Sequence, residues 1–455
     1  MSLFYESPLI TQYASTEMKG VFSSNFKYQT WRKLWVALAE GEKELGLNIS
    51  EKQIEEMRSN IKTIDFEKVR RYEKENRHEV LAHIQAFGDI CPGAKGIIHL
   101  GASSSFVTDN GDLIVLKTAL NFIRGKLILL IEKLNHFSLK EIETPCLGYT
   151  HFQPAEIITL GRRSALWLQD FLTDFKDLIH LMDDFPFLGC KESFLSLFEG
   201  DHQKVIALDD KVTQKMGFKR PYLICNKTYP RKQEERILSL LASIGTSAHK
   251  CANDLRLLSH LGEIEEPCDS KQIYKRNPIF SERVCGLSRF VMNLWHNGAD
   301  NAAHQWLEHS LDDSSNRQIT IPEAFLATDS IVNLLYTIIN GLKVYPKVME
   351  AHVEEHLPYL SSEIILAAAI LKGKERDKTY ETLRKITFEA SQTKKETGKS
   401  PSDLLKTLLQ AVGLTENEMS DLLQMKNLTG RSREQVLEFL KLEVQPYLEK
   451  HFIKP

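Results

Sequence analysis

The most constraining feature of the sequence is the stretch between Pro92 and Pro145, which contains no proline. Within it, the segment from Asp112 to Glu143 carries leucine or isoleucine at every third or fourth position. This spacing places one apolar stripe along a helix, and Gly125 is its only weak point. We expect a helix of roughly 20 to 30 residues, well above the globular average of about 11 to 12.

The same periodicity recurs in two later segments, from Arg162 to Asp184 and from Lys232 to Glu265. Helical patterns continue from Ser281 to about Ser310 and from Pro322 to Gly341, while alternating strand patterns are rare. The chain is therefore predicted to be all-α, with long helices that form a bundle.

The first long helix is expected to be apolar on more than one side, because Leu127 to Ile131 is an unbroken apolar run. Two arrangements would bury such a helix: enclosure within one chain, or packing against other copies. Helices of this length usually need neighbours on several faces, so we expect an oligomer.

Changes in character along the chain predict three domains. A turn near Gly101 leads into the first long helix, and beyond Val344 the expected helices are shorter, with polar and lysine-rich segments between them. We place an N-terminal helical domain at 1–103, a central long-helix bundle at 104–344 and a C-terminal helical domain at 345–455.

The charge balance and the cysteines argue against several classes of function. Basic and acidic side chains number 58 and 61, so the net charge of −3 gives no reason to expect nucleic acid or a charged membrane as a partner. The seven cysteines form no CxxC pair, which argues against a zinc knuckle or a disulfide framework. We find no signal peptide and no apolar stretch of membrane-spanning length, so we expect a cytoplasmic location.

A histidine between two prolines is the first candidate for chemistry. Gly148 to Pro154 reads GYTHFQP, and Pro145 and Pro154 bracket it, which predicts a loop or bend between two long helices. His151 in this segment could donate a proton near neutral pH. The alternative, which spacing alone favours, is a loop histidine bonded to the backbone.

A second histidine cluster, from Arg77 to His83, reads RHEVLAH. It has one residue more than the HExxH zinc motif, and the five positions between His78 and His83 are poor helical spacing for a shared metal. We expect a charged helix face here and no metal site.

Three polar segments have the composition of anion sites. Leu100 to Asn110 (LGASSSFVTDN) places hydroxyls ahead of a helix, where they can hold a carboxylate or phosphate, or simply cap the helix through Ser104 or Asp109. Tyr274 to Arg283 (YKRNPIFSER) supplies basic residues and an amide that could clamp a carboxylate. Leu311 to Arg317 (LDDSSNR) is a polar cluster between helices. Solvated turns are the alternative for the last two.

Together these motifs resemble those of the fumarate-releasing lyases, and among them the adenylosuccinate lyases. The order GASSxxxxDN, THFQPA, YKRNPxxSER and LDDSSNR in an all-helical chain carries the resemblance. It extends from QYAS around Tyr13, through WRKLW at 31–35 and FEGD at 198–201, to TGR at 429–431. The resemblance therefore covers nearly the whole chain.

The resemblance implies an assembly and a reaction. Members of this family are homotetramers built around a shared bundle of long helices, with active sites where three subunits meet. Their reaction is a β-elimination: a base removes a proton from a succinyl group, an acid protonates the departing nitrogen, and fumarate leaves without any metal or organic cofactor. We therefore expect the conversions of adenylosuccinate to AMP and of SAICAR to AICAR in purine biosynthesis.

Residue by residue, the resemblance also assigns roles. His151 matches the general acid, Lys275 matches a signature residue that faces the succinyl group, and His78 matches an active-site histidine, so these three are the expected catalytic residues. The substrate-binding positions share only their place in the family motifs; they are Gln12, Tyr13, Arg77, His78, Glu79, Ser103, Ser104, Lys227, Asn277, Arg283, His309, Ser314 and Gln318.

Departures from the family pattern that change positive charge fall at four of these positions. The family has arginines where this chain has Gln12, His309 and Gln318, and a glutamine where it has Lys227. Because the resemblance places those arginines around the nucleotide phosphate, their loss removes bidentate phosphate contacts. The alternative substrate is a different succinyl-amine that lacks a phosphate.

Two glycine-rich loops are shorter than in the family. The family has Gly-Ser-Ser-Ala-Met-Pro where Ile273 here runs straight into Tyr274, and the absent segment would have carried the general-base serine. A second loop is shortened between Gly189 and Phe194. We expect both to be mobile segments that the printed chain leaves out. The alternative is a true deletion in a catalytically inactive helical oligomer.

Overall fold

A computed structural model covers the chain, and it describes residues 4–267, 275–421 and 423–452. The described part is predominantly helical, as predicted, with two short two-stranded sheets. The three helices expected from periodicity are all present: α6 at Ser104–Lys140, α7 at Leu160–Asp183 and α9 at Lys232–His260. The first of them has 37 residues, which exceeds even the predicted length.

The chain divides into two compact units, which we describe separately. Unit 1 consists of Met1–Leu127, Thr173–His249 and Cys285–Asn333, and unit 2 of Ile128–Leu172, Lys250–Val284 and Leu334–Pro455. Five helices contribute residues to both units: α6, α7, α9, α10 at Ile279–Ala303 and α11 at Asp313–Gly341. The division into three domains at 103 and 344 remains a prediction.

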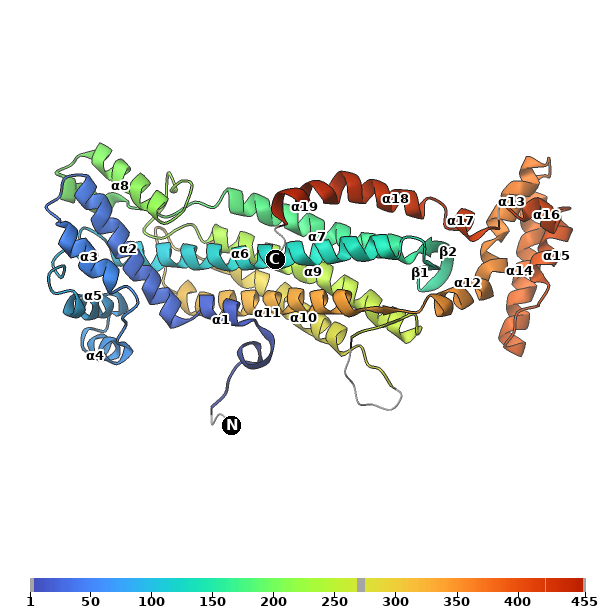
Figure 1. Cartoon of the computed structure of the whole chain (residues 1–455), viewed down its shortest axis with the longest axis horizontal. Helices are drawn as coiled ribbons and strands as arrows, with labels where there is room; N and C mark the ends of the chain where they lie inside the picture. The colour runs from blue at the N-terminus through green and yellow to red at the C-terminus, as the bar shows by residue number, and fades with distance from the viewer. Residues whose placement is uncertain (1–3, 268–274, 422, 453–455) are drawn as a thin grey trace. The chain divides into compact units, whose positions relative to one another are not determined.

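In unit 1, short helices gather beside α2, as Figure 1 shows for α3 to α5. Small polar residues set where these helices begin, because Ser50 and Asp65 accept hydrogen bonds from backbone N–H groups of the first turns of α3 and α4. The elements that lie wholly in this unit are η1 (Leu9–Tyr13), α1 (Thr16–Val21), α2 (Ser24–Glu44), α3 (Glu51–Ser59), α4 (Phe66–Asn76), α5 (Glu79–Ile90), η2 (Glu192–Phe198) and α8 (His202–Lys215).

Polar side chains join the long helices within unit 1. Lys126 of α6 forms an ion pair with Asp329 of α11, whose carboxylate is fully buried. The Trp295 indole N–H of α10 donates to Glu235 of α9 at 3.3 Å. The parts of these helices that belong to unit 1 run alongside one another, so residues far apart in sequence meet on facing sides (Figure 1).

Unit 2 contains both sheets. Strand β1 (Pro145–Thr150) pairs antiparallel with β2 (Gln153–Thr159), and β3 (Ile264–Glu265) pairs antiparallel with β4 (Lys343–Val344). Beyond β4 the chain forms α12 (Pro346–Leu360), α13 (Ser362–Leu371), α14 (Arg376–Thr397), α15 (Leu404–Ala411), α16 (Glu416–Met419), α17 (Met425–Leu428), α18 (Ser432–Phe439), η3 (Leu440–Val444) and α19 (Gln445–His451). Helices α13 to α16 share one apolar core that includes Ile365, Leu383 and Leu408.

Of the helices in the described part of the chain, none combines the length and the apolar character needed to cross a membrane.

Candidate active site

His151 lies at the tip of a β-hairpin in unit 2. The predicted bend between two long helices is confirmed, since the hairpin joins α6 to α7, but its arms are paired strands, which were not predicted. His151 and Phe152 form the two-residue turn between β1 and β2, with φ of 52° and 58°. Positive φ at both central residues is the mark of a type I′ turn, which usually carries Asn-Gly. Because this turn lacks Asn-Gly, it carries no sequence signal for a hairpin. His151 is exposed at this tip, where it can meet a substrate.

Residues 275–283 lead into α10, also in unit 2. Lys275 and Arg283 are both exposed, while Asn277 is half-buried. The Glu266 carboxylate accepts the Ser281 backbone N–H at 2.8 Å and so helps to fix the first turn of α10. The segment therefore presents basic side chains from a fixed helix start.

The predicted general-base loop falls between Ile273 and Tyr274, which lie outside the described residues. The 455-residue sequence is continuous through this position. The shortening therefore belongs to the chain itself, and our expectation that mobile residues are left out of the printed sequence is wrong.

His78 and Ser104, two of the predicted substrate-binding residues, meet in unit 1. His78 is the N-cap of α5, and its Nδ1 accepts the Leu81 backbone N–H at 3.2 Å. Its Nε2 lies 3.3 Å from the Ser104 hydroxyl at the start of α6. Because Nδ1 is occupied as an acceptor, a neutral His78 carries its proton on Nε2, where it can donate. Arg77 precedes it in a left-handed conformation, with φ of 52°.

The other histidine of the RHEVLAH segment is a core residue. His83 is buried and stacks on Tyr28, with ring centroids 3.8 Å apart. Burial lowers the pKa of His83 to about 4. The expectation of a charged helix face holds for Glu79 but not for His83.

Glu79 forms an ion pair at one edge of unit 1. Its carboxylate accepts from the Lys27 ammonium and from the Tyr28 hydroxyl, each at 2.8 Å. Burial acts to raise the pKa of Glu79, but Lys27 and Tyr28 outweigh it and hold that pKa below its usual range. Glu79 and Lys27 are therefore both charged and already paired.

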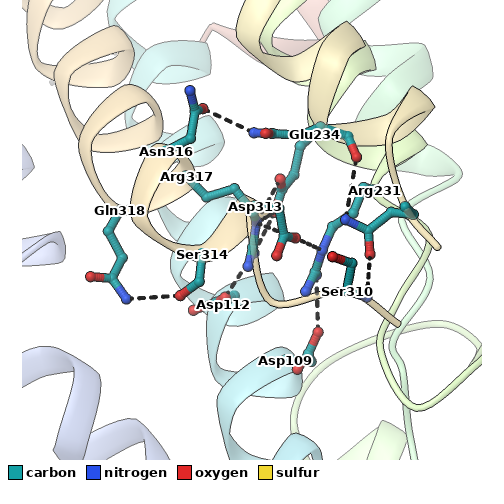
Figure 2. Close-up of polar contacts among 12 residues, drawn as sticks. Asp109, Asp112, Arg231, Glu234, Ser310, Asp313, Ser314, Asn316, Arg317 and Gln318 are labelled. Atoms are coloured by element: carbon teal, nitrogen blue, oxygen red, sulfur yellow. Dashed lines mark hydrogen bonds and ion pairs between the residues drawn. The ribbon is translucent and has the colours of Figure 1, made fainter. Parts of the chain in front are cut away.

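A cavity of about 390 Å³, which we call the Arg317 cavity, collects four of the predicted substrate-binding residues: Glu79, His309, Ser314 and Gln318. Ser314 and Gln318 lie on the first turns of α11, where the Gln318 amide donates to the Ser314 hydroxyl at 3.2 Å (Figure 2). The remaining lining residues are Val21, Phe22, Ser23, Lys27, Thr108, Asp109, Asp112, Val115, Leu116, Tyr229, Arg231, Leu311, Asp313, Arg317, Ile321 and Pro322.

Arg317 forms the densest set of polar contacts in this cavity. Its guanidinium donates to Glu234 at 2.8 Å, to Asp112 at 2.9 Å and to the Tyr229 hydroxyl at 2.8 Å (Figure 2 labels the first two). Burial opposes the charge on Arg317, but Tyr229 and Glu234 outweigh it and raise the pKa of Arg317 further. The guanidinium is therefore a fixed charge whose donors point to protein acceptors.

Arg231 is held in the same way. Its guanidinium lies 3.0 Å from Asp109 and 2.7 Å from Asp313, and all three side chains are buried (Figure 2). Asp109 was a candidate helix cap, but α6 begins five residues before it, so that alternative is wrong. Sequence reasoning missed Arg231, although the TYPR segment beside Lys227 was the available signal.

A second cavity of about 660 Å³, the Lys191 cavity, is lined by the predicted residues Ser103 and Lys227. The shortened second loop forms part of its wall. The Asn110 side chain holds Gly189 from both sides, accepting its N–H at 3.0 Å and donating to its carbonyl at 3.1 Å. Lys191 pairs with Asp209 at 2.6 Å. The shortened loop is thus fixed by partners on α6 and α8.

Two predicted residues lie elsewhere. Gln12 is exposed and Tyr13 is half-buried, both in η1. Neither is among the described residues that line the two cavities.

Comparison with known proteins agrees with this helical fold. The profile of the family described as Lyase matches residues 36–293. The structure is similar to that of a 3-carboxy-cis,cis-muconate lactonizing enzyme from Pseudomonas putida, with a TM-score of 0.82, 21% identity and coverage of 95% of this chain and 98% of the other. A fumarate lyase from Mesorhizobium sp. BNC1 is similar at a TM-score of 0.81 and 20% identity, covering 96% of this chain and 100% of the other. At these identities, the likeness shows the fold alone.

Three relatives with higher sequence identity than these two structures are adenylosuccinate lyases. The adenylosuccinate lyase of Schizosaccharomyces pombe is 41% identical, with 98% of this chain and 95% of the relative covered. Those of Saccharomyces cerevisiae and Schistosoma mansoni are 40% and 42% identical, each with 98% of this chain and 96% of the relative covered. The chain therefore belongs to the lyase family and, within it, to the adenylosuccinate lyases, which are C–N lyases.

Proposed function

We propose that this chain releases fumarate from a succinylated purine of the adenylosuccinate type by β-elimination. One observation carries the proposal: relatives named adenylosuccinate lyase are 40% to 42% identical to this chain over 98% of its length. The reaction belongs to purine biosynthesis, and a cytoplasmic location remains a prediction of the sequence. The contacts of the described residues support a division of labour among them.

His151 is the proposed general acid. An exposed imidazole at the tip of a hairpin can reach a departing nitrogen and give it a proton. His78 and Ser104 are proposed to hold a substrate carboxylate, because their donors converge within 3.3 Å of each other at the start of α6. The exposed ammonium of Lys275 would stabilise negative charge on the succinyl group during proton removal.

The general base is the missing part of this scheme. The segment that would have carried the serine is absent from the sequence between Ile273 and Tyr274. Loss of a positioned base typically slows an elimination by about 10² to 10⁴-fold. We therefore expect slow turnover, unless another residue has taken over the role of the base.

We propose that the chain forms a homotetramer in which several subunits share each site. Apolar side chains on the long helices support association: Leu166 of α7 is 51% exposed, Leu257 of α9 44% and Phe290 of α10 41%. Contact with other copies would bury these side chains.

The test is absorbance-monitored fumarate release from adenylosuccinate by the full chain, compared with the His151→Asn variant. Asparagine tolerates the left-handed conformation of this turn better than most residues do, so the hairpin should be kept while the acid is lost. We expect release by the unaltered chain, and a fall of about 10² to 10⁴-fold in the variant.

Insertion of Gly-Ser-Ser-Ala-Met-Pro between Ile273 and Tyr274 separates a slow enzyme from an inactive one. If the unaltered chain releases no fumarate and the insertion restores release, the deletion has made the chain an inactive oligomer. If His151→Asn retains the rate of the unaltered chain, His151 is not the acid.

A further inference from the structure

Every lysine and arginine that lines the Arg317 cavity is already paired with a carboxylate, so none is available for a phosphate. Three cationic side chains line the cavity, Lys27, Arg231 and Arg317, and each is already bonded to carboxylates of the chain. Against these three cations, the lining has four carboxylates: Glu79, Asp109, Asp112 and Asp313. The fixed charge of the lining is therefore negative, which opposes a dianion.

The lining residues that remain available to contact a ligand are mainly uncharged or are hydrogen-bond acceptors. Gln318 is exposed and Ser314 half-buried, and their amide and hydroxyl groups carry no charge. His309 is exposed and supplies at most one positive charge, and only when protonated. An amide and a hydroxyl suit a partner that both donates and accepts hydrogen bonds.

Asp313 also favours a ligand that donates a hydrogen bond. It lines the cavity, it is only 3% exposed, and its Oδ1 has no hydrogen-bond partner in the described part of the chain. A buried acceptor of this kind gains from a donor. A sugar hydroxyl can donate a hydrogen bond, whereas a phosphate dianion offers only acceptors.

We propose that the Arg317 cavity binds the non-phosphorylated form of the leaving group, so that the preferred substrate is a succinylated purine nucleoside and not its nucleotide. The inference rests on the proposed fumarate release, because it takes the cavity as the site of the purine end. Gln318, at the open side of the cavity, is the specificity-determining residue.

The experiment compares the binding of adenosine and AMP to the full chain by calorimetry, a measurement that needs no turnover. We expect adenosine to bind at least as tightly as AMP. The double variant His309→Arg with Gln318→Arg adds guanidiniums to the lining, and it should shift the affinity ratio towards AMP by roughly tenfold or more. Gln214→Arg places one guanidinium on an exposed position of α8, outside the cavity lining, and should leave the ratio unchanged.

The binding and cleavage assays together distinguish a failure of the nucleoside preference from a failure of the proposed fumarate release. Tighter binding of AMP than of adenosine by the unaltered chain would overturn the inference, and so would a failure of both ligands to bind. A matching fumarate assay uses adenylosuccinate and its dephosphorylated nucleoside. If neither is cleaved while adenosine still binds at least as well as AMP, the proposed reaction fails and the specificity of the cavity stands.

Discussion

At the scale of single residues, several charged side chains of unit 1 are paired inside the protein. Arg231 and Arg317 both form ion pairs with buried carboxylates, and Lys27 forms one with Glu79. Glu42 is an exception, because it is fully buried in α2 and neither of its carboxylate oxygens has a partner in the described part of the chain. Burial raises the pKa of Glu42 to about 8.

Glu42 should therefore make the stability of the chain fall as pH rises. The folded state keeps the proton of Glu42 up to about pH 8, whereas the unfolded state loses it near its ordinary value of 4.5. Between these values unfolding releases a proton, so stability falls by at most about 1.4 kcal/mol per pH unit. We expect the melting temperature of Glu42→Gln to match that of the unaltered chain at pH 4.5 and to exceed it by a few degrees at pH 8.

Glu389→Gln is the control, because Glu389 is exposed on α14. A gap between Glu42→Gln and the unaltered chain that stays constant from pH 4.5 to 8 would show that Glu42 is not buried in its protonated form.

Which residues meet was only partly predictable from the sequence. The motifs singled out Glu79, Ser314 and Gln318, which the fold gathers in one cavity, while their role in substrate binding stays a prediction. Arg231 and Asp112 were missed. The TYPR segment draws attention to Arg231, but no local pattern indicates that either residue pairs with a residue 82 or 205 positions away. Such pairs arise from helix packing, which periodicity does not encode.

At the scale of elements, α7 starts in close contact with the end of α6. In unit 2, a Cβ on Gly161 would lie 2.6 Å from the Ser138 carbonyl oxygen and 2.7 Å from the Ile142 Cα. The Ser138 and Ser164 hydroxyls are also 2.8 Å apart across the two helices. The helices can therefore approach this closely only because residue 161 has no side chain.

Gly161→Ala should destabilise the chain by about 1 to 3 kcal/mol, because backbone atoms cannot move aside as a side-chain end can. Gly125→Ala makes the same change at an exposed position in the interior of α6, where a Cβ would meet no atom of the chain within 4 Å. That variant should gain about 0.5 to 1 kcal/mol. Thermal unfolding of both variants measures the two effects, and a Gly161→Ala variant as stable as Gly125→Ala would refute the close contact.

The element boundaries show what periodicity can and cannot predict. The apolar repeats located α6, α7 and α9 well, since burial along a stripe requires that pattern. The hairpin of β1 and β2 was not expected, because its turn is His151–Phe152 and its strands lack clear alternation. A hairpin turn without glycine or asparagine is hard to predict from sequence.

At the scale of the whole molecule, the expected tetramer can be tested through activity. We predict that mixed assemblies of His151→Asn and His78→Asn subunits regain fumarate release. Asparagine is a favoured helix cap, so His78→Asn should keep the start of α5 intact. If the two histidines of a site come from different subunits, random mixing leaves about a quarter of the sites with both.

Co-expression of the two variants, followed by a fumarate assay on the purified mixture, makes the measurement. Each variant alone serves as the control. A mixture no more active than its components would mean that one subunit supplies both histidines, and the proposal of shared sites would be lost.

The turn at His151 and Phe152 has a consequence for the evolution of the chain. Two non-glycine residues in left-handed conformations cost of order 1 to 3 kcal/mol each. In a laboratory selection for heat resistance alone, this turn should be among the first positions to change, towards Asn-Gly. In a selection for fumarate release, the histidine should persist while its neighbour drifts. The two selections would thus separate the cost of the turn in stability from its contribution to fumarate release.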